Sequence, residues 1–332
     1  MKKITTLVSG IMMAAAVVSV QAEERDYILN TASTGGTYHP VGTAISTLSK
    51  IKLLPKEKFS LTAVNSAGSG ANVQAMGAGT ADFAILQGLY GSYAVTGTGP
   101  VTAPQENVRS VTMLWQNVEH FVIANANVSS GTMSDMVAAK GTGMGMGAKN
   151  SGTIGSNKVL LAGLGIDIET DYELMYGGYG PTADAMANGQ IVGAGIAAGV
   201  PAGAITKLMA SNEGQFTVLD VTPEELAKMD GGRDLWTPYT IKSGTYPGQT
   251  ADISTIAQPN FLAVNASVAE DDVYKLTKAM YENLNFLQAI HPATNAMSIE
   301  SAIAGLPAPL HPGAARYYKE VGLTIPDRLI SK

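Results

Sequence analysis

The chain has 332 residues, four histidines, no cysteine and a formal net charge of −6 at pH 7. The absence of cysteine excludes disulfide bonds, thiolate metal sites and a lipid-anchored cysteine, and the acidic balance argues against a nucleic-acid partner. Hydrophobic residues make up 45% of the chain and charged residues only 14%, so a chain of this length can form two domains with cores of their own.

The first 22 residues have the pattern of a secretory signal peptide. Lys2 and Lys3 precede an apolar segment from Leu7 to Val20, and Val20-Gln21-Ala22 carries small residues at both cleavage positions. We therefore predict cleavage after Ala22 and a mature protein in the periplasm. No later segment has about 18 consecutive apolar residues, so we expect the mature chain to be soluble.

The first predicted strand of the mature chain covers residues 27–32, and the turn Gly35-Gly36-Thr37-Tyr38-His39-Pro40 follows it. A helix is predicted directly after this turn, at 41–50. A strand that leads through a glycine turn into a helix places free backbone N–H groups and the positive end of the helix beside an aromatic ring. Such a turn can bind a small anion with an apolar body. It is equally typical of an ordinary tight connection with a tyrosine in the core.

Apolar strand-like segments alternate with helical patterns along the rest of the chain. The helical patterns include 156–164 and 271–285, and strands are predicted at 61–64, 83–86, 121–124, 144–147, 191–196, 216–219 and 261–264. Alternation of this kind predicts an α/β fold with mainly parallel sheets. The 37 glycines suit short turns and close packing of helices on sheets.

One pattern occurs twice. The segments from Ala75 to Phe83 and from Ala185 to Ile191 each combine the end of a helix, a glycine that stops it and the start of an apolar strand. Each helix follows a cluster of small and polar residues, at 66–70 and at 176–182. The repeat is short, and glycine-terminated helices are common. It nevertheless suggests two similar lobes that direct helix N-termini toward a shared cleft.

Motifs of enzyme active sites are scarce. The sequence has neither a G-x-S-x-G elbow nor a Walker motif. The segment from Gly143 to Ala148 fits a dinucleotide-binding variant, but it has the pattern of a strand, with no helix opening inside it. The four histidines lie far apart, and no pair of carboxylates occurs in the glycine-rich turns. We therefore predict no catalytic residues, no bound metal and no cofactor.

The glycine-rich turns carry neutral hydrogen-bonding side chains, with Lys149 as the one cation among them. These side chains are Thr34, Thr37, Tyr38, Ser66, Ser69, Asn72, Gln87, Asn150, Ser151 and Thr153. Many donors beside small and aromatic residues are typical of a recognition site for a polar anion. Serine, threonine and asparagine also prefer helix N-caps. Ser69, Ser151 and Thr153 can therefore be caps, ligand contacts or both.

In this order, the turns resemble the substrate-binding proteins of TRAP transporters, specifically those of the TAXI family. The matching stretches cover almost the entire mature chain: they are Thr34 to Pro40, Ser66 to Asn72, Asn150 to Thr153, Gly199 to Pro201, Ile241 to Gln249 and Leu310 to Tyr318. The resemblance implies a periplasmic binding protein with two α/β lobes joined by hinge strands. Lobe I would comprise residues 23–117 and 238–332, and lobe II residues 118–237.

The resemblance also implies a function. A monomeric protein of this kind captures a small carboxylate, such as glutamate, 2-oxoglutarate or a related dicarboxylate, and delivers it to the membrane subunits of a sodium-driven TRAP transporter. The residues expected to bind the ligand are Gly36, Thr37, Tyr38, Ser66, Ser69, Asn72 and Gln87 in lobe I, and Lys149, Asn150, Ser151, Thr153, Ala198 and Pro201 in lobe II.

Two positions depart from the family's pattern. Gln87-Gly88-Leu89 stands where the family has Gln-Ser-Asp, and Lys149 stands where it has a small residue or proline. If both side chains face the cleft, they favour a 2-oxo acid or dicarboxylate over glutamate, whose ammonium would find no obvious carboxylate. Two other functions stay open. One is a ligand sensor that docks on a membrane signalling protein. The other is a periplasmic hydrolase or lyase that uses Ser151 or Tyr38, and the missing neighbouring base counts against it.

Overall fold

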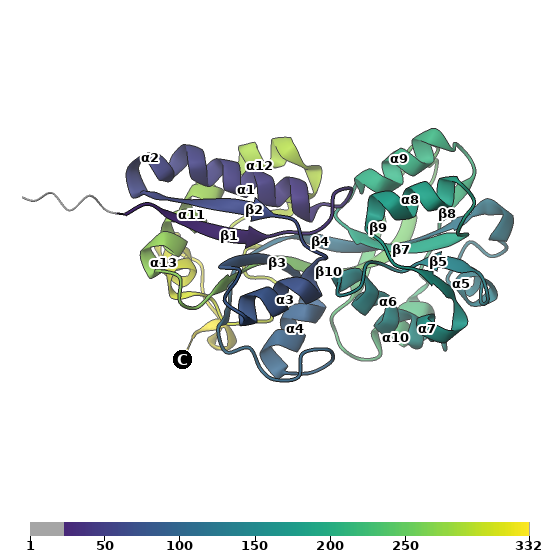
Figure 1. Ribbon diagram of the computed structural model, residues 1–332, viewed down its shortest axis with the longest axis horizontal. Coiled ribbons are helices and arrows are strands. Elements are labelled where there is room, and N and C mark those ends of the chain that lie inside the picture. Colours follow the sequence, from purple (N-terminus) through teal and green to yellow (C-terminus); the bar gives the residue numbers. More distant parts are fainter. Residues whose placement is uncertain (1–22, 332) are drawn as a thin grey trace, which may run out of the picture.

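A computed structural model describes residues 23–331 (Figure 1). The predicted signal peptide, residues 1–22, lies outside this range. Within it, no helix combines the length and the apolar character that a membrane span requires. The described chain forms two lobes that lie side by side, and two long strands connect them (Figure 1).

The strands of the described chain pair into one hydrogen-bonded path, in the main order β2-β1-β3-β10-β4-β7-β5-β6, with β8 beside β4 and β9 beside β10. They are β1 (Arg25–Asn30), β2 (Phe59–Val64), β3 (Phe83–Gln87), β4 (Val108–Ala124), β5 (Gly143–Gly145), β6 (Glu173–Met175), β7 (Gly193–Ala198), β8 (Phe216–Val218), β9 (Thr237–Ile241) and β10 (Ile253–Asn265).

The strand order has an internal symmetry. The parallel strands β2-β1-β3 lie next to β10 in lobe I, and the parallel strands β6-β5-β7 lie next to β4 in lobe II. In each lobe the strand that comes first in the chain is the middle one, so the next two strands lie on opposite sides of it. The chain reverses direction across the sheet at this point, and α/β sheets bind ligands there, outside the carboxyl ends of the strands.

Helices cover both faces of each lobe. In lobe I they are α1 (Tyr38–Lys52), α2 (Leu54–Glu57), α3 (Ser69–Gly77), α4 (Gly88–Thr96), α11 (Glu270–Glu282), α12 (Leu284–Ile290) and α13 (Pro312–Glu320). In lobe II they are α5 (Ser134–Ala138), α6 (Gly152–Ala162), α7 (Ile168–Asp171), α8 (Tyr179–Ala187), α9 (Gly203–Ser211) and α10 (Pro223–Asp230). Short 3-10 helices occupy Asn125–Asn127, Pro292–Ala296 and Asp327–Leu329.

In each lobe, the two faces of the sheet carry different helices. In Figure 1, α1 and α12 lie on one face of lobe I and α3 and α4 on the other, while α8 and α9 lie opposite α6, α7 and α10 in lobe II. Helix α1 shows the pattern that produces this layering. Val41, Ile45 and Leu48 recur once per turn and are buried against the sheet, whereas Lys50 and Lys52 are exposed.

Strands β4 and β10 run through both lobes and pair with each other from the Val108–Asn265 pair to the Val118–Ala257 pair. One hydrophobic core takes its residues from 29–115 and 261–329, and two others take theirs from 118–257, apart from Leu89. From this packing we propose that the chain leaves lobe I near residue 117 and returns near residue 258. This return is later than the predicted residue 238, because residues 241, 246 and 257 pack in a lobe II core.

The predicted α/β architecture is confirmed, and each predicted strand overlaps a strand of the structure. The prediction of mainly parallel pairing is wrong, because the long strands β4 and β10 run antiparallel to each other and to β3, β7, β8 and β9. The lengths of the hinge strands were not predicted. The segments 121–124 and 261–264 are parts of strands of 17 and 13 residues. Asn117, Glu119 and His120 interrupt the apolar pattern of β4, although all three are buried. Polar residues of this kind hide a buried strand from pattern analysis.

Candidate functional site

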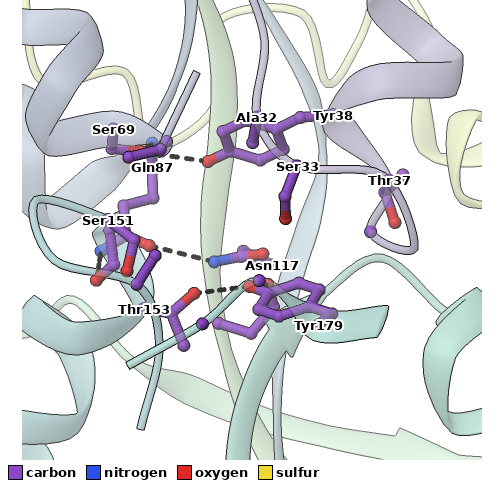
Figure 2. Close-up of a pocket in the computed structure, with 18 residues that line it drawn as sticks. Ala32, Ser33, Thr37, Tyr38, Ser69, Gln87, Asn117, Ser151, Thr153 and Tyr179 are labelled. Atoms are coloured by element: carbon purple, nitrogen blue, oxygen red, sulfur yellow. Dashed lines mark hydrogen bonds between the residues drawn. The ribbon is translucent and has the colours of Figure 1, made fainter. Parts of the chain in front are cut away.

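A pocket with about 450 Å³ of empty space, part of it open solvent, lies between the lobes (Figure 2). Lobe I contributes Ala32, Ser33, Gly36, Thr37, Tyr38, Ala67, Gly68, Ser69 and Gln87 to its wall. Lobe II contributes Ala148, Ser151, Gly152, Thr153, Gly177, Gly178, Tyr179 and Ala197, and the hinge strand β4 contributes Asn117. None of these residues carries a charged side chain, so a charged ligand would meet only neutral groups.

Four helices, α1, α3, α6 and α8, begin at the cavity. Their first residues, Tyr38, Ser69, Gly152 and Tyr179, all line it. This convergence follows from the strand order, because α1 and α3 follow β1 and β2 in lobe I, and α6 and α8 follow β5 and β6 in lobe II. The first turn of a helix has backbone N–H groups without partners in the helix and carries a partial positive charge. Four such ends can hold a small anion without a charged side chain.

In lobe I, Tyr38 is the centre of a hydrogen-bonded group. Its hydroxyl donates to Asn260 Oδ1 at 2.6 Å and lies 3.3 Å from Ser69 Oγ, which accepts the backbone N–H of Gln87 at 3.1 Å. The Tyr38 ring meets Trp115 edge to face, with 5.8 Å between the ring centroids. Burial raises the pKa of Tyr38 well above its usual value. The residue therefore presents an apolar ring with a neutral polar tip.

In lobe II, Ser151 is the N-cap of α6, and its Oγ accepts the backbone N–H of Ile154 at 3.1 Å. The hydroxyl of Tyr179 hydrogen-bonds to Thr153 Oγ1 and to the carbonyl of Ala197. Since a carbonyl only accepts, Tyr179 donates to Ala197 and Thr153 donates to Tyr179. Burial raises the pKa of Tyr179, so this second aromatic wall is neutral as well.

Hydrogen bonds on one side of the cavity join the two lobes directly. Gln87 Nε2 in lobe I donates to the carbonyl of Gly152 at 2.9 Å and to Ser156 Oγ at 3.0 Å in lobe II. The backbone N–H of Ala71, in the first turn of α3, donates to the carbonyl of Asn150 at 2.9 Å. The cavity is therefore closed on this side by the contact between α3 and the start of α6.

A second set of hydrogen bonds joins the lobes on the other side of the cavity. Thr37 Oγ1 donates to the carbonyl of Gly199 at 3.2 Å. The backbone N–H of Ala204 donates to the carbonyl of Gly35 at 3.1 Å. Because both sides are bridged, the structure shows a closed arrangement of the lobes around the cavity.

A buried acid lies in the hinge behind the cavity wall. Glu119 Oε1 accepts hydrogen bonds from Trp236 Nε1 at 3.0 Å and from Gln258 Nε2 at 3.3 Å. Gln258 Nε2 also donates to Ser156 Oγ at 3.0 Å, the oxygen that Gln87 reaches from lobe I. Burial raises the pKa of Glu119 to about 7. Glu119 does not line the cavity, so its connection to a ligand would run through Ser156 and Gln87.

The structure brings one group of the predicted ligand-binding residues together at the cavity: Gly36, Thr37, Tyr38, Ser69, Gln87, Ser151 and Thr153. At two of these residues, the structural role and the place at the cavity, which the sequence left as alternatives, occur together. Tyr38 is part of the lobe I core and also lines the cavity. Ser151 is both a helix cap and a cavity residue.

Ser66 and Asn72 do not line the cavity, contrary to the prediction. Asn72 lies one turn further along α3 and is fully buried, with its Nδ2 donating to the carbonyls of Thr31 at 2.8 Å and Ile85 at 2.9 Å. Ser66 Oγ lies 2.6 Å from Asn72 Oδ1 and accepts the N–H of Gly68 at 2.9 Å. Both side chains therefore fix the turn before α3 to the ends of β1 and β3.

Lys149 and Asn150 also lie outside the cavity wall. Lys149 is exposed, and its Nζ lies 4.9 Å from the centre of the Tyr176 ring. Asn150 adopts a φ of 60° and contributes its carbonyl, not its side chain, to the contact with lobe I. Leu89, where the family has an acid, packs in a lobe II core. Neither Leu89 nor Lys149 lines the cavity, so neither side chain favours a more anionic ligand.

Ala198 and Pro201 do not line the cavity, contrary to the prediction, although residues close to them in the chain do contact the cavity or lobe I. Ala198 is buried in a lobe II core, and its neighbour Ala197 lines the cavity instead, because adjacent residues of a strand point to opposite faces. Pro201 lies in the turn between β7 and α9. In that turn it is the carbonyl of Gly199 that contacts lobe I.

Ser33, Asn117 and Tyr179 line the cavity and were not predicted. Tyr179 begins the helix of the second repeated unit, so the internal repeat was a signal for it. Asn117 lies inside β4, where no local pattern marks a binding residue. Its Nδ2 donates to Gln87 Oε1 at 3.2 Å, and its Oδ1 has no hydrogen-bond partner among residues 23–331.

The hydroxyl groups at the cavity have no adjacent base. Ser151 Oγ accepts a backbone N–H, and the Tyr38 hydroxyl contacts Asn260 and Ser69. In the described part of the chain, no three His, Asp or Glu side chains are grouped so that they could hold a metal ion. The arrangement can bind and orient an anion, and it shows no activated nucleophile.

Comparisons with known proteins agree with this geometry. MatC from Rhodopseudomonas palustris, solved with bound malate, matches 90% of this chain and 99% of its own, with a TM-score of 0.54 and 14% identity. A binding protein component of an ABC phosphonate transporter from Pseudomonas aeruginosa matches 81% of this chain and 78% of its own, with a TM-score of 0.51 and 12% identity. These likenesses show the two-lobed fold of periplasmic binding proteins. The model of the NMT1-like family matches residues 29–322, so the chain belongs to the NMT1-like family.

Proposed function

We propose that this protein is a periplasmic solute-binding protein of the TAXI type, which captures a small organic anion and delivers it to a sodium-driven TRAP membrane transporter. The ligand is 2-oxoglutarate, glutamate or a related dicarboxylate. The protein acts as a monomer and without catalysis. The signal sequence predicted at residues 1–22 directs it to the periplasm.

The observation that carries this proposal is the convergence of four helix N-termini on an uncharged cavity between two lobes. The helix ends supply donors for a carboxylate from both lobes. The rings of Tyr38 and Tyr179 supply apolar walls for the carbon skeleton. The wall offers no carboxylate to an ammonium group, which disfavours an amino acid within this set of ligands.

The relatives support the same class of ligand. Malate, bound by MatC, is a C4 dicarboxylate, and the phosphonate-transporter component belongs to a system for another small anion. Both share the two-lobed fold with this chain. A ligand that contacts both lobes stabilises the closed arrangement, which is how hinge closure is coupled to binding.

Binding of a panel of C4–C6 mono- and dicarboxylates, measured by calorimetry and thermal shift, tests the ligand class. A ligand present at a hundredfold excess over its Kd should raise the free energy of unfolding by about 2.7 kcal/mol. Ser151→Ala should weaken binding about tenfold, because it removes a cavity hydroxyl and loosens the start of α6.

Thr222→Ala is the matched control for Ser151→Ala. Thr222 caps α10, accepts the N–H of Glu225 at 3.2 Å and does not line the cavity. Its loss should cost similar stability and leave the Kd unchanged. Binding of sugars, peptides or metal ions alone would refute the proposed ligand class.

Uptake into proteoliposomes tests the proposed partner. Vesicles that contain TRAP membrane subunits should take up the ligand only with this protein and an inward sodium gradient. Ligand binding without any sodium-driven uptake would instead favour a sensor that docks on a signalling protein.

A further inference from the structure

Asn117 presents an unpaired acceptor at the cavity. The residue lies in the hinge strand β4 and is 1% exposed, and Figure 2 shows it between Tyr38 and Tyr179. Its Oδ1 has no hydrogen-bond partner among the described residues. A buried amide oxygen without a donor is costly, and native structures rarely leave one unpaired unless a ligand or water completes it.

The orientation of the Asn117 amide follows from its neighbours. The carbonyl of Gly152 can only accept, so the group of Gln87 that faces it is the Nε2 amine, at 2.9 Å. Gln87 Oε1 therefore faces Asn117, and Asn117 must turn its own Nδ2 toward it, at 3.2 Å. A flipped amide would place two oxygens against each other. The atom left over at the cavity is consequently the acceptor Oδ1.

The surrounding hydroxyl groups do not satisfy this oxygen. The proton of Tyr38 goes to Asn260 Oδ1, and the proton of Tyr179 goes to the carbonyl of Ala197. No described residue donates to Asn117 Oδ1, so its donor is left to the occupant of the cavity, a ligand group or a water molecule. An ionised carboxylate and a keto oxygen only accept, so neither can supply it. An ammonium group can donate, but the cavity wall offers no carboxylate to balance its charge.

We propose that the ligand is a hydroxycarboxylate whose hydroxyl group donates to Asn117 Oδ1, an inference that rests on the proposed function and narrows it. The carboxylate ends lie at the helix N-termini, and the hydroxyl carbon faces the hinge. Asn117 thereby selects for the substituent on the carbon chain, while the helix ends select for the anionic groups. The preferred ligand class is then the 2-hydroxy acids rather than the 2-oxo or 2-amino acids.

Two ligand series that differ only in this substituent test the inference in the unaltered protein. The C4 series is succinate, malate, oxaloacetate and aspartate, and the C5 series is glutarate, 2-hydroxyglutarate, 2-oxoglutarate and glutamate. In at least one series we expect the hydroxy acid to bind about tenfold more tightly than the unsubstituted acid, as measured by calorimetry. Preference for an oxo or amino acid, or equal affinities, overturns the inference but leaves the proposed anion receptor standing. No binding of any member refutes both.

Asn117→Leu assigns the preference to this side chain. The substitution has similar volume and removes the acceptor, so the hydroxy acid should lose its tenfold advantage while the unsubstituted acid keeps its affinity. Ser151→Ala is the control, because it should weaken both acids by the same factor. A hydroxyl preference that persists in Asn117→Leu overturns the assignment. Thermal unfolding verifies that the variant folds, and the ligand series stands without it.

Discussion

The two lobes contain one backbone unit twice, and the two copies line the cavity with different side chains. The first copy is α3 followed by β3, and the second is α8 followed by β7. Both helices have nine residues, and in both a glycine with positive φ follows the C-cap residue, Gly79 with a φ of 69° and Gly189 with a φ of 68°. The turns have matching backbone hydrogen bonds. The N–H of Thr80 donates to the carbonyl of Ala75, and the N–H of Gln190 donates to the carbonyl of Ala185, each at 2.9 Å.

Equivalent positions of the two units face the ligand space. The first helical residue and the fifth strand residue line the cavity in each, and they are Ser69 and Gln87 in lobe I and Tyr179 and Ala197 in lobe II. Gln87 bonds across to lobe II, whereas Tyr179 and Ala197 bond to each other. The lobe I unit therefore supplies polar contacts that form only when the lobes close. The lobe II unit supplies an aromatic wall whose Tyr179–Ala197 hydrogen bond does not depend on closure.

The largest expected effect comes from the second residue of each helix, where both units have glycine. A Cβ at Gly70 would lie 2.5 Å from the carbonyl oxygen of Asn150, across the lobe boundary, whereas a Cβ at Gly180 would meet nothing within 4 Å. Gly70→Ala should therefore hold the lobes apart and weaken ligand binding about 1,000-fold, or about 4 kcal/mol. Calorimetry measures the affinity, and small-angle scattering with ligand measures the closure.

Gly180→Ala is the matched control, because both substitutions change helix propensity in the same way. It should leave the affinity unchanged and stabilise α8 by up to about 1 kcal/mol. Equal affinities of the two variants would show that the contact between α3 and Asn150 does not govern closure.

The next effect is on stability, through two buried groups at neighbouring positions of β4. Glu119 connects to the lobe I unit through Ser156 and Gln87, and His120 lies 3.1 Å from the carbonyl of Ile196 in the lobe II unit. Burial raises the pKa of Glu119 from 4.5 to about 7 and lowers the pKa of His120 from 6.5 to about 4. Burial thus disfavours the charged form of both groups.

The two shifts have opposite signs in the pH dependence of stability. The folded state holds the Glu119 proton more tightly, so this group's contribution is present below pH 4.5 and is lost as the pH rises to about 7. The folded state resists the His120 proton, so its contribution is present above pH 6.5 and is lost as the pH falls to about 4. Each change amounts to about 3 kcal/mol.

Glu119→Gln and His120→Asn separate these terms. Denaturant unfolding between pH 4 and pH 7.5 measures the free energy of unfolding. Glu119→Gln should remove the loss of stability toward neutral pH, and His120→Asn should remove the loss of stability toward acidic pH. Parallel pH profiles of either variant and the unaltered protein would mean that the group does not titrate in this range.

A smaller effect is expected at the fifth strand residue of the lobe I unit. Gln87→Leu removes the bonds to Gly152 and Ser156, so the carbonyl of Gly152 loses this donor in the closed form, while Ser156 Oγ keeps its bond from Gln258. Binding should weaken by about 2 kcal/mol, or roughly 30-fold, since the open form does not need these bonds. Gln74→Leu, at an exposed position of α3, is the control and should change nothing. An unchanged Kd in Gln87→Leu would show that polar contacts of this unit do not favour closure.

The features of the two units that the sequence predicted are those set by residues close together in the chain. Glycine stops, helix starts and strand segments depend on neighbouring residues, so the repeated unit and cavity residues such as Ser69 and Ser151 could be found from patterns. Asn72 and Ser66 have the same chemistry as true cavity residues, and only their contacts with Thr31 and Ile85 show that they fix the turn.

The hinge was the part that patterns could not supply. Asn117 and Glu119 acquire their roles from strands and helices that are distant in the chain, such as Gln87, Ser156 and Gln258. Their polar character also interrupts the apolar run that would have revealed β4 as one long strand. Asn117 and Glu119 therefore carry no signal in their own sequence neighbourhood.

The smallest effect is expected at the third residue before each helix, where lobe I has Ser66 and lobe II has Tyr176. Ser66 bonds inside its own turn, whereas Tyr176 is exposed and carries the Lys149 ammonium on its ring. Lys149 is the only charge in the predicted site, and water surrounds it. At 0.15 M salt, charges are screened over about 8 Å. Lys149→Ala should therefore change the Kd less than about twofold for a monoanion and a dianion alike, as measured by calorimetry at that salt concentration. A tenfold loss of affinity for the dianion alone would show that the lysine turns toward the ligand. Lobe II would then contribute a positive charge to binding in addition to its aromatic wall.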